Sequence, residues 1–224
     1  LMSEPQLFLL DAHALCYRAF YAIKGLATSK GQATNAVYGF TNILRKILRE
    51  QQPEYLAVCF DSPTKTRRQE KFAEYKVHRP VMPDDLISQI PIIKEVVRAH
   101  KLAVYEFPGY EADDIIATLV KKFAGPQLDV VIVSDDKDMF QLVGDHVKVL
   151  SARKERILGP AEVQETLGVS PERVVDYIAL AGDSSDNIPG VHGIGEVTAQ
   201  KLVEEYGALE NILAHLVEIK PKRA

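Results

Sequence analysis

The stretch "LFLLD" (residues 7–11) is an apolar run without polar alternation that ends in an acid, Asp11. The same form recurs in "YLAVCFD" (residues 55–61) and in "VVIVSDD" (residues 130–136). Short continuous apolar runs are typical of strands buried on both faces, whereas a sheet with one solvated face gives alternating residues. These stretches therefore predict a parallel sheet that is covered by helices on both sides.

Segments with helical periodicity alternate with the apolar runs. Strands are predicted at residues 7–10, 56–60, 102–107, 130–133 and 147–150, and helices at residues 33–50, 83–100 and 112–123. After Arg156 helices dominate, with segments predicted at residues 160–167, 171–181, 195–206 and 208–216. The alternation predicts an α/β fold, a parallel twisted sheet flanked by helices, in residues 1–156, and a helical subdomain in residues 157–224.

Composition and cysteine usage exclude several classes of protein. The chain has 224 residues, of which 46% are hydrophobic and 26% charged, and this balance indicates a soluble globular protein with a sizeable core. It shows neither a signal peptide nor an apolar stretch long enough for a membrane span, so we expect a cytosolic protein. Cys16 and Cys59 lie among apolar neighbours without metal-ligand spacing, which favours buried thiols over a disulfide or a zinc site.

The net charge of −4 hides a basic segment. Residues 65–79 contain six basic side chains against two acidic ones, a local net charge of +4; the basic ones are Lys65, Arg67, Arg68, Lys71, Lys76 and Arg79. A run of this kind is often only a solvated surface. Here it is interleaved with Phe72, Tyr75 and His78, a composition typical of surfaces that bind phosphates and stack bases.

Acids follow the predicted strands at their carboxyl ends. Three strands lead into Asp11, into Asp61 and into "SDDKD" (residues 134–138), and a fourth leads into "GYEADD" (residues 109–114). Any one of these acids could be a routine cap, since acids in the first turn of a helix complement its dipole. In an open parallel sheet, however, the carboxyl ends share one edge, where ligands bind. Four strands would thus deliver carboxylates to a single crevice.

Carboxylates crowded in this way repel one another unless cations neutralise them. Oxygen ligands without a His or Cys cluster select magnesium or manganese, and two such ions can activate a water and stabilise both reacting oxygens at a phosphate. This chemistry indicates phosphodiester hydrolysis. An aspartyl phosphatase is disfavoured, because its nucleophile is normally followed two residues later by a second acid, whereas Asp11 is followed by Ala12 and His13.

The helical part contains the stretch "GDSSDNIPGVHGIGEVTAQKL" (residues 182–202). Asp183 and Asp186 either cap a helix or extend the acid set from outside the sheet. Three glycines precede the next predicted helix, at Gly190, Gly193 and Gly195. Such a hairpin can turn backbone N–H groups toward a phosphate, although glycine spacing alone is a weak signal. With the acids and the basic segment, it fits a clamp for a duplex backbone that is bound without regard to sequence.

Five motifs together resemble the 5′ nuclease domain at the N-terminus of bacterial DNA polymerase I, a member of the flap endonuclease family with a PIN-like fold. They are "LLDAHALCYRAFYA" (residues 9–22), "AVCFDSPTKTRRQEKFAEYKVHRPVMPDDL" (residues 57–86), "GYEADDIIATL" (residues 109–119), "VSDDKDMFQLV" (residues 133–143) and the stretch at residues 182–202. They occur in the expected order and cover almost the whole chain. Several motifs in order are far more specific than a lone glycine pattern.

The resemblance implies a magnesium- or manganese-dependent, structure-specific nuclease that cuts 5′ flaps and degrades 5′ ends of DNA in replication and repair. It implies that the single strand passes under a basic helical arch, here residues 64–83. It also implies a helix-hairpin-helix element that holds the duplex, often with a potassium ion. We expect a monomeric, cytoplasmic bacterial protein, joined to a polymerase domain if the chain is part of a longer one.

The resemblance also assigns roles to individual residues. Two or more metal ions would be held by a first cluster of Asp11, Asp61, Glu111 and Asp113, with Asp114 nearby, and by a second cluster of Asp136, Asp138, Asp183 and Asp186. Lys76 and Arg79 would lie beside the scissile phosphate, and Arg18 would contact a phosphate near the metals. The remaining DNA contacts would come from Arg68 and Lys71, from Tyr75 by stacking on a base, and from Gly193, Gly195 and Thr198 in the hairpin.

The chain departs from the family pattern at three points. Ala12 stands where the family usually has glycine, Asp135 is an extra acid that we interpret as a bystander, and the chain stops at Ala224, before the last expected helices. Two other functions fit part of the pattern. A PIN-type ribonuclease would share the strand-end acids but usually lacks the arch and the glycine hairpin. A non-catalytic nucleic-acid-binding module should have lost some acids, and this chain retains every expected one.

Overall fold

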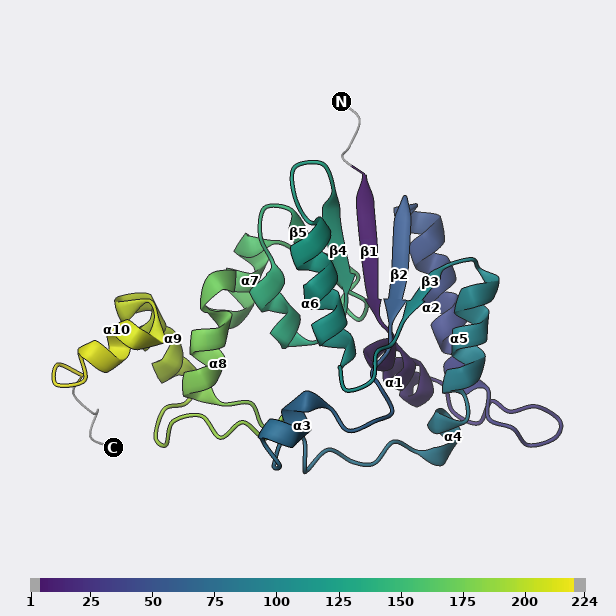
Figure 1. The fold of residues 1–224 in the computed structure, drawn as a ribbon, viewed down its shortest axis with the longest axis horizontal. Coiled ribbons are helices and arrows are strands. Elements are labelled where there is room, and N and C mark those ends of the chain that lie inside the picture. Colours follow the sequence, from purple (N-terminus) through teal and green to yellow (C-terminus); the bar gives the residue numbers. More distant parts are fainter. Residues whose placement is uncertain (1–4, 220–224) are drawn as a thin grey trace.

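The computed structural model describes residues 5–219 and shows within them one sheet of six strands in the order β3-β2-β1-β4-β5-β6 (Figure 1). Neighbouring strands are parallel except for β6, which is antiparallel to β5. The strands are β1 (Gln6–Asp11), β2 (Tyr55–Cys59), β3 (Ala103–Tyr105), β4 (Asp129–Val133), β5 (Val147–Ser151) and β6 (Arg156–Leu158). The predicted α/β fold is confirmed.

Helices cover both faces of the sheet and form the C-terminal region (Figure 1). The α-helices are α1 (Ala12–Ala22), α2 (Asn35–Gln51), α3 (Arg67–Lys71), α4 (Asp84–Ile87), α5 (Ile90–Ala99), α6 (Ala112–Phe123), α7 (Pro160–Leu167), α8 (Val174–Ala181), α9 (Glu196–Tyr206) and α10 (Leu209–Ala214). Two 3-10 helices join them, η1 (Lys137–Leu142) and η2 (Pro171–Arg173). Within residues 5–219, no helix has the length and apolar character needed to cross a membrane.

Alternate residues of β1 point to opposite faces of the sheet. Leu7 and Leu9 belong to a buried cluster with α6 and the C-terminal helices, whereas Phe8 and Leu10 belong to a second cluster with α1, α2 and α5. Each of the four side chains is at most 9% exposed, so the strand is covered on both faces, as its continuous apolar run predicts. The first cluster continues from the sheet into α9 and α10. The helical region therefore shares a core with the sheet, and a domain boundary at residue 156 stays a prediction.

The sequence patterns do not predict α1 or β6, and they predict one helix at residues 83–100 where the structure has α4 and α5. The buried face of α1 consists of small or medium side chains, namely Ala12, Leu15, Cys16 and Ala19. Bulky aromatic residues at other positions of the same helix obscure the helical periodicity of these buried positions in the sequence. The short strand β6 is fixed by tertiary pairing with β5, which a local pattern cannot report.

The connection from β2 to α5 crosses the carboxyl ends of the strands (Figure 1). It contains the arch, residues 64–83, in which α3 begins with a capping box between Thr66 and Gln69. Two backbone hydrogen bonds fasten its start to the loop before α6, from Ser62 N to Tyr110 O at 3.1 Å and from Arg67 N to Gly109 O at 3.0 Å. The connection from β2 to α5 therefore places the basic segment directly over the edge where the strand-end acids lie.

Gln89 fastens the other end of the connection. Its side chain is fully buried, and its Oε1 accepts hydrogen bonds from the N–H groups of Ala36 at 2.8 Å and Val37 at 3.1 Å. Its Nε2 donates to Asn35 Oδ1 at 3.0 Å and to Asp85 O at 2.8 Å. The first N–H groups of a helix have no partner within the helix, so Gln89 caps α2 from a different element.

Replacing Gln89 by Leu should lower the free energy of unfolding by about 3 kcal/mol, because one buried and one partly buried N–H group of α2 would lose their acceptor. Urea unfolding measures this change. Gln127→Leu, at an exposed loop position, is the control and should be nearly neutral. A loss below about 1 kcal/mol at Gln89 would show that the cap is dispensable.

Candidate metal and nucleic-acid site

Five carboxylates line one pocket of about 340 Å³ at the carboxyl edge of the sheet, those of Asp11, Asp61, Glu111, Asp113 and Asp136. Asp11 ends β1, Asp61 follows β2, and Asp136 follows β4, while Glu111 and Asp113 lie at the start of α6. The parallel strand order therefore brings acids that are far apart in the sequence to one place.

Several of these acids also cap helices. Asp11 Oδ1 accepts from Ala14 N at 3.1 Å at the start of α1, and Asp61 Oδ1 accepts from Ala112 N at 2.7 Å at the start of α6. Asp136 Oδ1 accepts from the N–H of Asp138 at 3.0 Å. Each bond fixes the rotamer of a carboxylate whose second oxygen is left for another partner. Capping and a role in the pocket are thus compatible in the same side chain.

Burial raises the pKa of two acids that have little counter-charge near them. It raises the pKa of Asp11 to about 7, and the charge of Asp61 acts in the same direction. Burial, followed by the charge of Asp136, likewise raises the pKa of Asp138 to about 7. Asp138 Oδ1 is buried and has no hydrogen-bond partner within residues 5–219. A buried oxygen without a donor, in a set of hard oxygen ligands, fits a divalent cation such as magnesium.

A tight loop between α8 and α9 presents Asp183 and Asp186, which are 4% and 7% exposed. Asp183 and Ile188 exchange two backbone hydrogen bonds, at 2.8 and 2.7 Å, which close the loop. Asp183 Oδ1 accepts from Ser185 N at 2.9 Å and from Ser185 Oγ at 2.6 Å. Burial acts to raise the pKa of Asp183. These bonds and the charge of Lys137 outweigh it, so the pKa is lowered.

The loop can close because Gly182 and Gly190 let its two ends approach closely. A Cβ atom on Gly190 would lie 2.5 Å from Gly182 N, and one on Gly182 would lie 2.7 Å from Ile188 O. Both glycines also have positive φ, of 63° and 81°. Gly190 was predicted as part of the duplex-binding glycine hairpin, but the structure uses it to hold the acidic loop closed.

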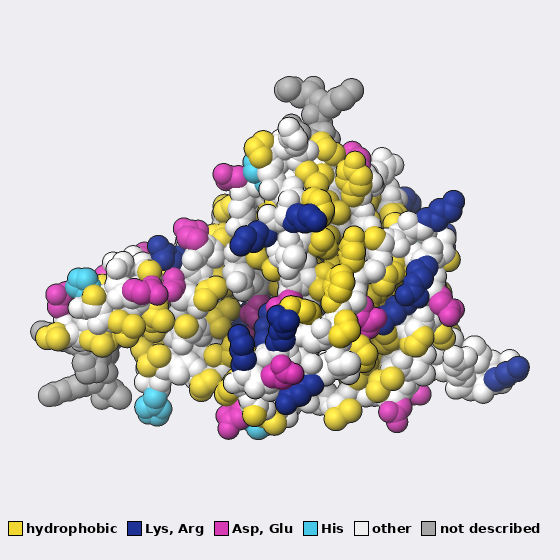
Figure 2. All heavy atoms as spheres, in the orientation of Figure 1, with side chains coloured by type: hydrophobic (Ala, Val, Ile, Leu, Met, Phe, Trp, Pro, Cys, Tyr) yellow, Lys and Arg dark blue, Asp and Glu magenta, His cyan; other side chains and the backbone are white. Residues whose placement is uncertain are grey.

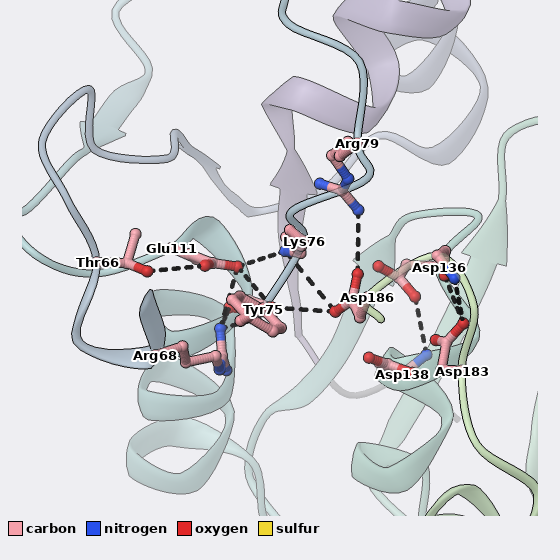
Figure 3. A network of polar contacts seen from close by, with 12 residues as sticks. Thr66, Arg68, Tyr75, Lys76, Arg79, Glu111, Asp136, Asp138, Asp183 and Asp186 are labelled. Atoms are coloured by element: carbon pink, nitrogen blue, oxygen red, sulfur yellow. Dashed lines mark hydrogen bonds and ion pairs between the residues drawn. The ribbon is translucent and has the colours of Figure 1, made fainter. Parts of the chain in front are cut away.

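Basic side chains of the arch contact the acids (Figure 3). Lys76 Nζ lies 2.6 Å from Glu111 Oε2 and 3.8 Å from Asp186 Oδ2, and Arg79 Nη2 lies 3.3 Å from Asp186 Oδ1. Burial raises the pKa of Glu111, but the hydrogen bond and charge of Lys76 outweigh it and hold that pKa below its usual range. The arch thus supplies counter-charge to both the sheet acids and the acidic loop.

Arg68 makes the densest set of ion pairs. Its Nη1 lies 2.8 and 3.0 Å from the two carboxylate oxygens of Asp113 and 3.2 Å from Glu111 Oε2, and its Nη2 lies 2.7 Å from Asp114 Oδ1. In Figure 2, Lys and Arg side chains lie over this region of the surface, with Asp and Glu side chains visible among them. Within residues 5–219, no three His, Cys, Asp or Glu side chains converge on one point able to hold a metal. Several of these acids are turned toward arch cations instead.

The aromatic ring of Tyr75 is buried, with only 7% of the residue exposed. Its hydroxyl lies 3.1 Å from Glu111 Oε2 and 3.0 Å from Asp186 Oδ2, so it bridges the two groups of acids. Burial and these two charges raise its pKa well above the usual range. In this conformation the ring is not available to stack on a base, so the stacking predicted for Tyr75 would require it to leave this position.

Arg18 does not line the acid pocket. Its Nη1 is buried, lies 3.6 Å from Asp135 Oδ2 and faces a separate pocket of about 180 Å³ with Lys46 and Glu155. Asp135 also accepts from Ser151 Oγ at 2.5 Å, away from the other acids. This arrangement agrees with Asp135 as a bystander, and it places the predicted phosphate contact of Arg18 outside the pocket.

The remaining predicted DNA contacts lie on the arch and the hairpin. Lys71 lines a pocket of about 450 Å³ between α3 and α8, together with Asp114, Asp138 and Asp186. Gly195 is the N-cap of α9, and Thr198 N donates to its carbonyl at 3.0 Å. Gly193 has positive φ, and a Cβ atom at Gly193 or Gly195 would meet nothing within 4 Å. The hairpin glycines therefore leave an open backbone surface.

Sequence reasoning missed three polar residues that support the acids. Thr66 Oγ1 donates to Glu111 Oε1 at 3.1 Å, Ser134 Oγ donates to Asp11 Oδ2 at 3.0 Å, and His13 Nδ1 accepts from Asp61 N at 3.1 Å. Burial lowers the pKa of His13, which favours the neutral ring that this bond requires. The capping-box pattern T-x-x-Q at Thr66 was a readable signal, whereas nothing local marks Ser134 or His13.

Comparison with known proteins gives consistent matches over the whole chain. Residues 6–168 match the family model described as the 5′-3′ exonuclease N-terminal resolvase-like domain, and residues 169–224 match the 5′-3′ exonuclease C-terminal SAM fold. The chain is 44% identical over 207 residues to a 5′-3′ exonuclease of Aquifex aeolicus, covering 92% of this chain and 72% of that protein. It is also 44% identical over 222 residues to the thermostable DNA polymerase I of Thermus aquaticus, covering 98% of this chain but 26% of that protein.

Solved structures show the same fold at lower identity. T5 5′-exonuclease with bound zinc ions aligns with a TM-score of 0.77 and 23% identity, covering 97% of this chain and 81% of that one. A complex of bacteriophage T5 D15 flap endonuclease with DNA and metal ions aligns with a TM-score of 0.77 and 22% identity, covering 97% and 81%. These likenesses establish the fold.

Gly190→Ala should destabilise the protein by about 3 kcal/mol or more, because the added Cβ would meet the backbone at Gly182 in a left-handed conformation. Gly193→Ala is the matched control, since its φ is also positive but its surroundings are open; we expect a cost of about 1 kcal/mol. Thermal and urea unfolding measure both. Equal losses in the two variants would mean that the backbone conformation, and not the close approach to Gly182, decides the effect.

Proposed function

The chain belongs to the 5′-3′ exonuclease family, and we propose that it is a divalent-metal-dependent, structure-specific nuclease that hydrolyses phosphodiesters at 5′ flaps and 5′ ends of DNA. The observation that carries this proposal is the pocket where five carboxylates, from three strand ends and the start of α6, meet cations of the arch. A site that handles both metal ions and a phosphate uses both charges at such close range. Replication and repair in a bacterial cytoplasm are the setting that fits this activity.

We propose that the acids hold two or more magnesium or manganese ions when the arch cations that they now contact move away. Asp11, Asp61, Glu111 and Asp113 would hold one, and Asp136, Asp138, Asp183 and Asp186 would hold another, with Asp114 near the first. Asp113 lines both the 340 Å³ and the 450 Å³ pockets, which supports a position between the two groups. Bound there, the ions would activate a water and stabilise the charge that develops on the phosphate under attack.

The arch supplies the positive charge for the substrate. Lys76 and Arg79 line the acid pocket, so a scissile phosphate placed there would lie within their reach. A cation beside the reacting phosphate is most effective when charge builds up in the transition state. We therefore assign Lys76 a role in turnover and Arg79, with Arg68 and Lys71, a role in guiding the single strand.

The hairpin from Gly190 to Thr198 is proposed to hold the duplex backbone. Its open glycines at Gly193 and Gly195 allow close approach of a phosphate to the N-terminus of α9. A potassium ion bound to backbone carbonyls of this hairpin would complete the contact. The chain spans about a quarter of the DNA polymerase I relatives that it matches, so a polymerase domain on the same polypeptide is a proposed partner.

One experiment tests the function directly. A labelled 5′-flap duplex, the matching single strand and an RNA hairpin are incubated with the protein in magnesium and in excess chelator. We expect the flap duplex to be cut fastest, cleavage to cease in chelator, and the fold to persist by circular dichroism. Undiminished flap cleavage in chelator would refute metal dependence, and preferred cleavage of the RNA hairpin would favour a PIN-type ribonuclease.

Asp136→Asn should reduce single-turnover cleavage by about 100-fold or more with little loss of flap binding, because a metal ligand acts mainly on the transition state. Asp135→Asn is the neighbouring control, since Asp135 binds Ser151 and lies outside the acid pocket. It should retain nearly full turnover. If Asp135→Asn is as damaging as Asp136→Asn, the ligand assignment in "SDDKD" is shifted by one residue.

A further inference from the structure

Glu111 Oε2 is the most crowded acceptor in the site. Within 3.2 Å it has three donors, Lys76 Nζ at 2.6 Å, Tyr75 OH at 3.1 Å and Arg68 Nη1 at 3.2 Å (Figure 3). Glu111 is 5% exposed, so water contributes little to its solvation. An oxygen that already meets three donors cannot also ligate a cation unless at least one of them leaves.

The same conflict exists at Asp113. Arg68 Nη1 contacts both carboxylate oxygens of Asp113, and its second amine holds Asp114. The Arg68 side chain is 38% exposed, so it has space on the solvent side into which it can rotate. Arg68 is therefore a side chain that has room to leave the acids, whereas Glu111 and Asp113 are held at the start of α6.

We propose that Arg68 and Lys76 are exchangeable counter-ions, which divalent metal displaces from Glu111 and Asp113 and thereby releases to bind the phosphates of the single strand. This inference rests on the proposed metal use of the site. Arg68 then couples metal binding to strand binding, which a residue that only contacts a phosphate does not do. Because coupling between two ligands is reciprocal, metal strengthens strand binding at the arch and the strand strengthens metal binding by the same factor.

Two hydrogen bonds hold the arch in place during this exchange. Lys76 N donates to Asp186 O at 3.1 Å, and Asn187 Nδ2 donates to Glu74 O at 2.8 Å. Neither bond uses a carboxylate oxygen, so both persist when the acids change partners. Arg68 and Lys76 can then swing from the acids to a phosphate while the arch backbone stays tied to the acidic loop.

Arg67 provides a matched control on the same helix. Its guanidinium lies 4.5 Å from the centre of the Tyr110 ring, and within residues 5–219 it makes no ion pair with the acids that Arg68 contacts. Arg67→Gln and Arg68→Gln remove the same charge from neighbouring positions. Only the loss of Arg68 removes a direct competitor of the metal.

The test measures binding of Mn²⁺ alone, without DNA, from the electron paramagnetic resonance signal of the free ion. We expect Arg68→Gln to bind Mn²⁺ about three- to tenfold more tightly than the unaltered chain, a coupling typical of partly exposed charges. Arg67→Gln should match the unaltered chain. Unchanged or weaker binding by Arg68→Gln, or an equal gain in both variants, would overturn the inference while leaving the proposed function in place.

Lys76→Gln gives a second, independent reading, because it removes a different donor from Glu111 Oε2. It should also bind Mn²⁺ more tightly, and its folding can be checked by urea unfolding. A decrease in Mn²⁺ affinity in Lys76→Gln would overturn the exchange at Glu111. Absence of Mn²⁺ binding by the unaltered chain itself would refute the proposed function together with the inference, so the two failures are distinguishable.

Discussion

Mutual repulsion of carboxylates at one edge of the sheet is the constraint on which the rest of the structure depends. Parallel strands place Asp11, Asp61 and Asp136 side by side, and α6 adds Glu111 and Asp113. Like charges at this range are tolerated only with counter-charge or by protonation. The chain uses both means: the arch brings cations to Glu111 and Asp113, while burial raises the pKa of Asp11 to about 7.

This constraint explains how a chain with net charge −4 can be suited to DNA. The +4 segment at residues 65–79 is folded over the acids, so the local field at the pocket differs from the average of the molecule. A phosphate approaching the pocket meets cations of the arch as well as the acids. Association would be steered by this local asymmetry and weakened by salt, whatever the total charge.

The sequence predicted the five parallel strands and the acids that follow them, because a continuous apolar run and the shared edge of a parallel sheet are simple rules. It could not predict which cation meets which acid. Arg67 and Arg68 are adjacent in the same run, yet successive residues of a helix point about 100° apart. One therefore stacks on Tyr110 and the other contacts Asp113. In the same way, glycine spacing could not distinguish Gly190, which closes a loop, from Gly193, which faces open space.

Capping is compatible with the proposed metal ligation by the same carboxylates. A cap occupies one oxygen and fixes the rotamer, as for Asp11 Oδ1 on Ala14 N and Asp61 Oδ1 on Ala112 N, and leaves the second oxygen oriented. A side chain held in this way needs no reorganisation when a cation arrives, which is the condition for a precise site. The arch residues differ, because Arg68 and Lys76 are long side chains with rotamers to exchange. Rigid acids and mobile bases at one edge are what a site needs if it is to bind metal and strand together.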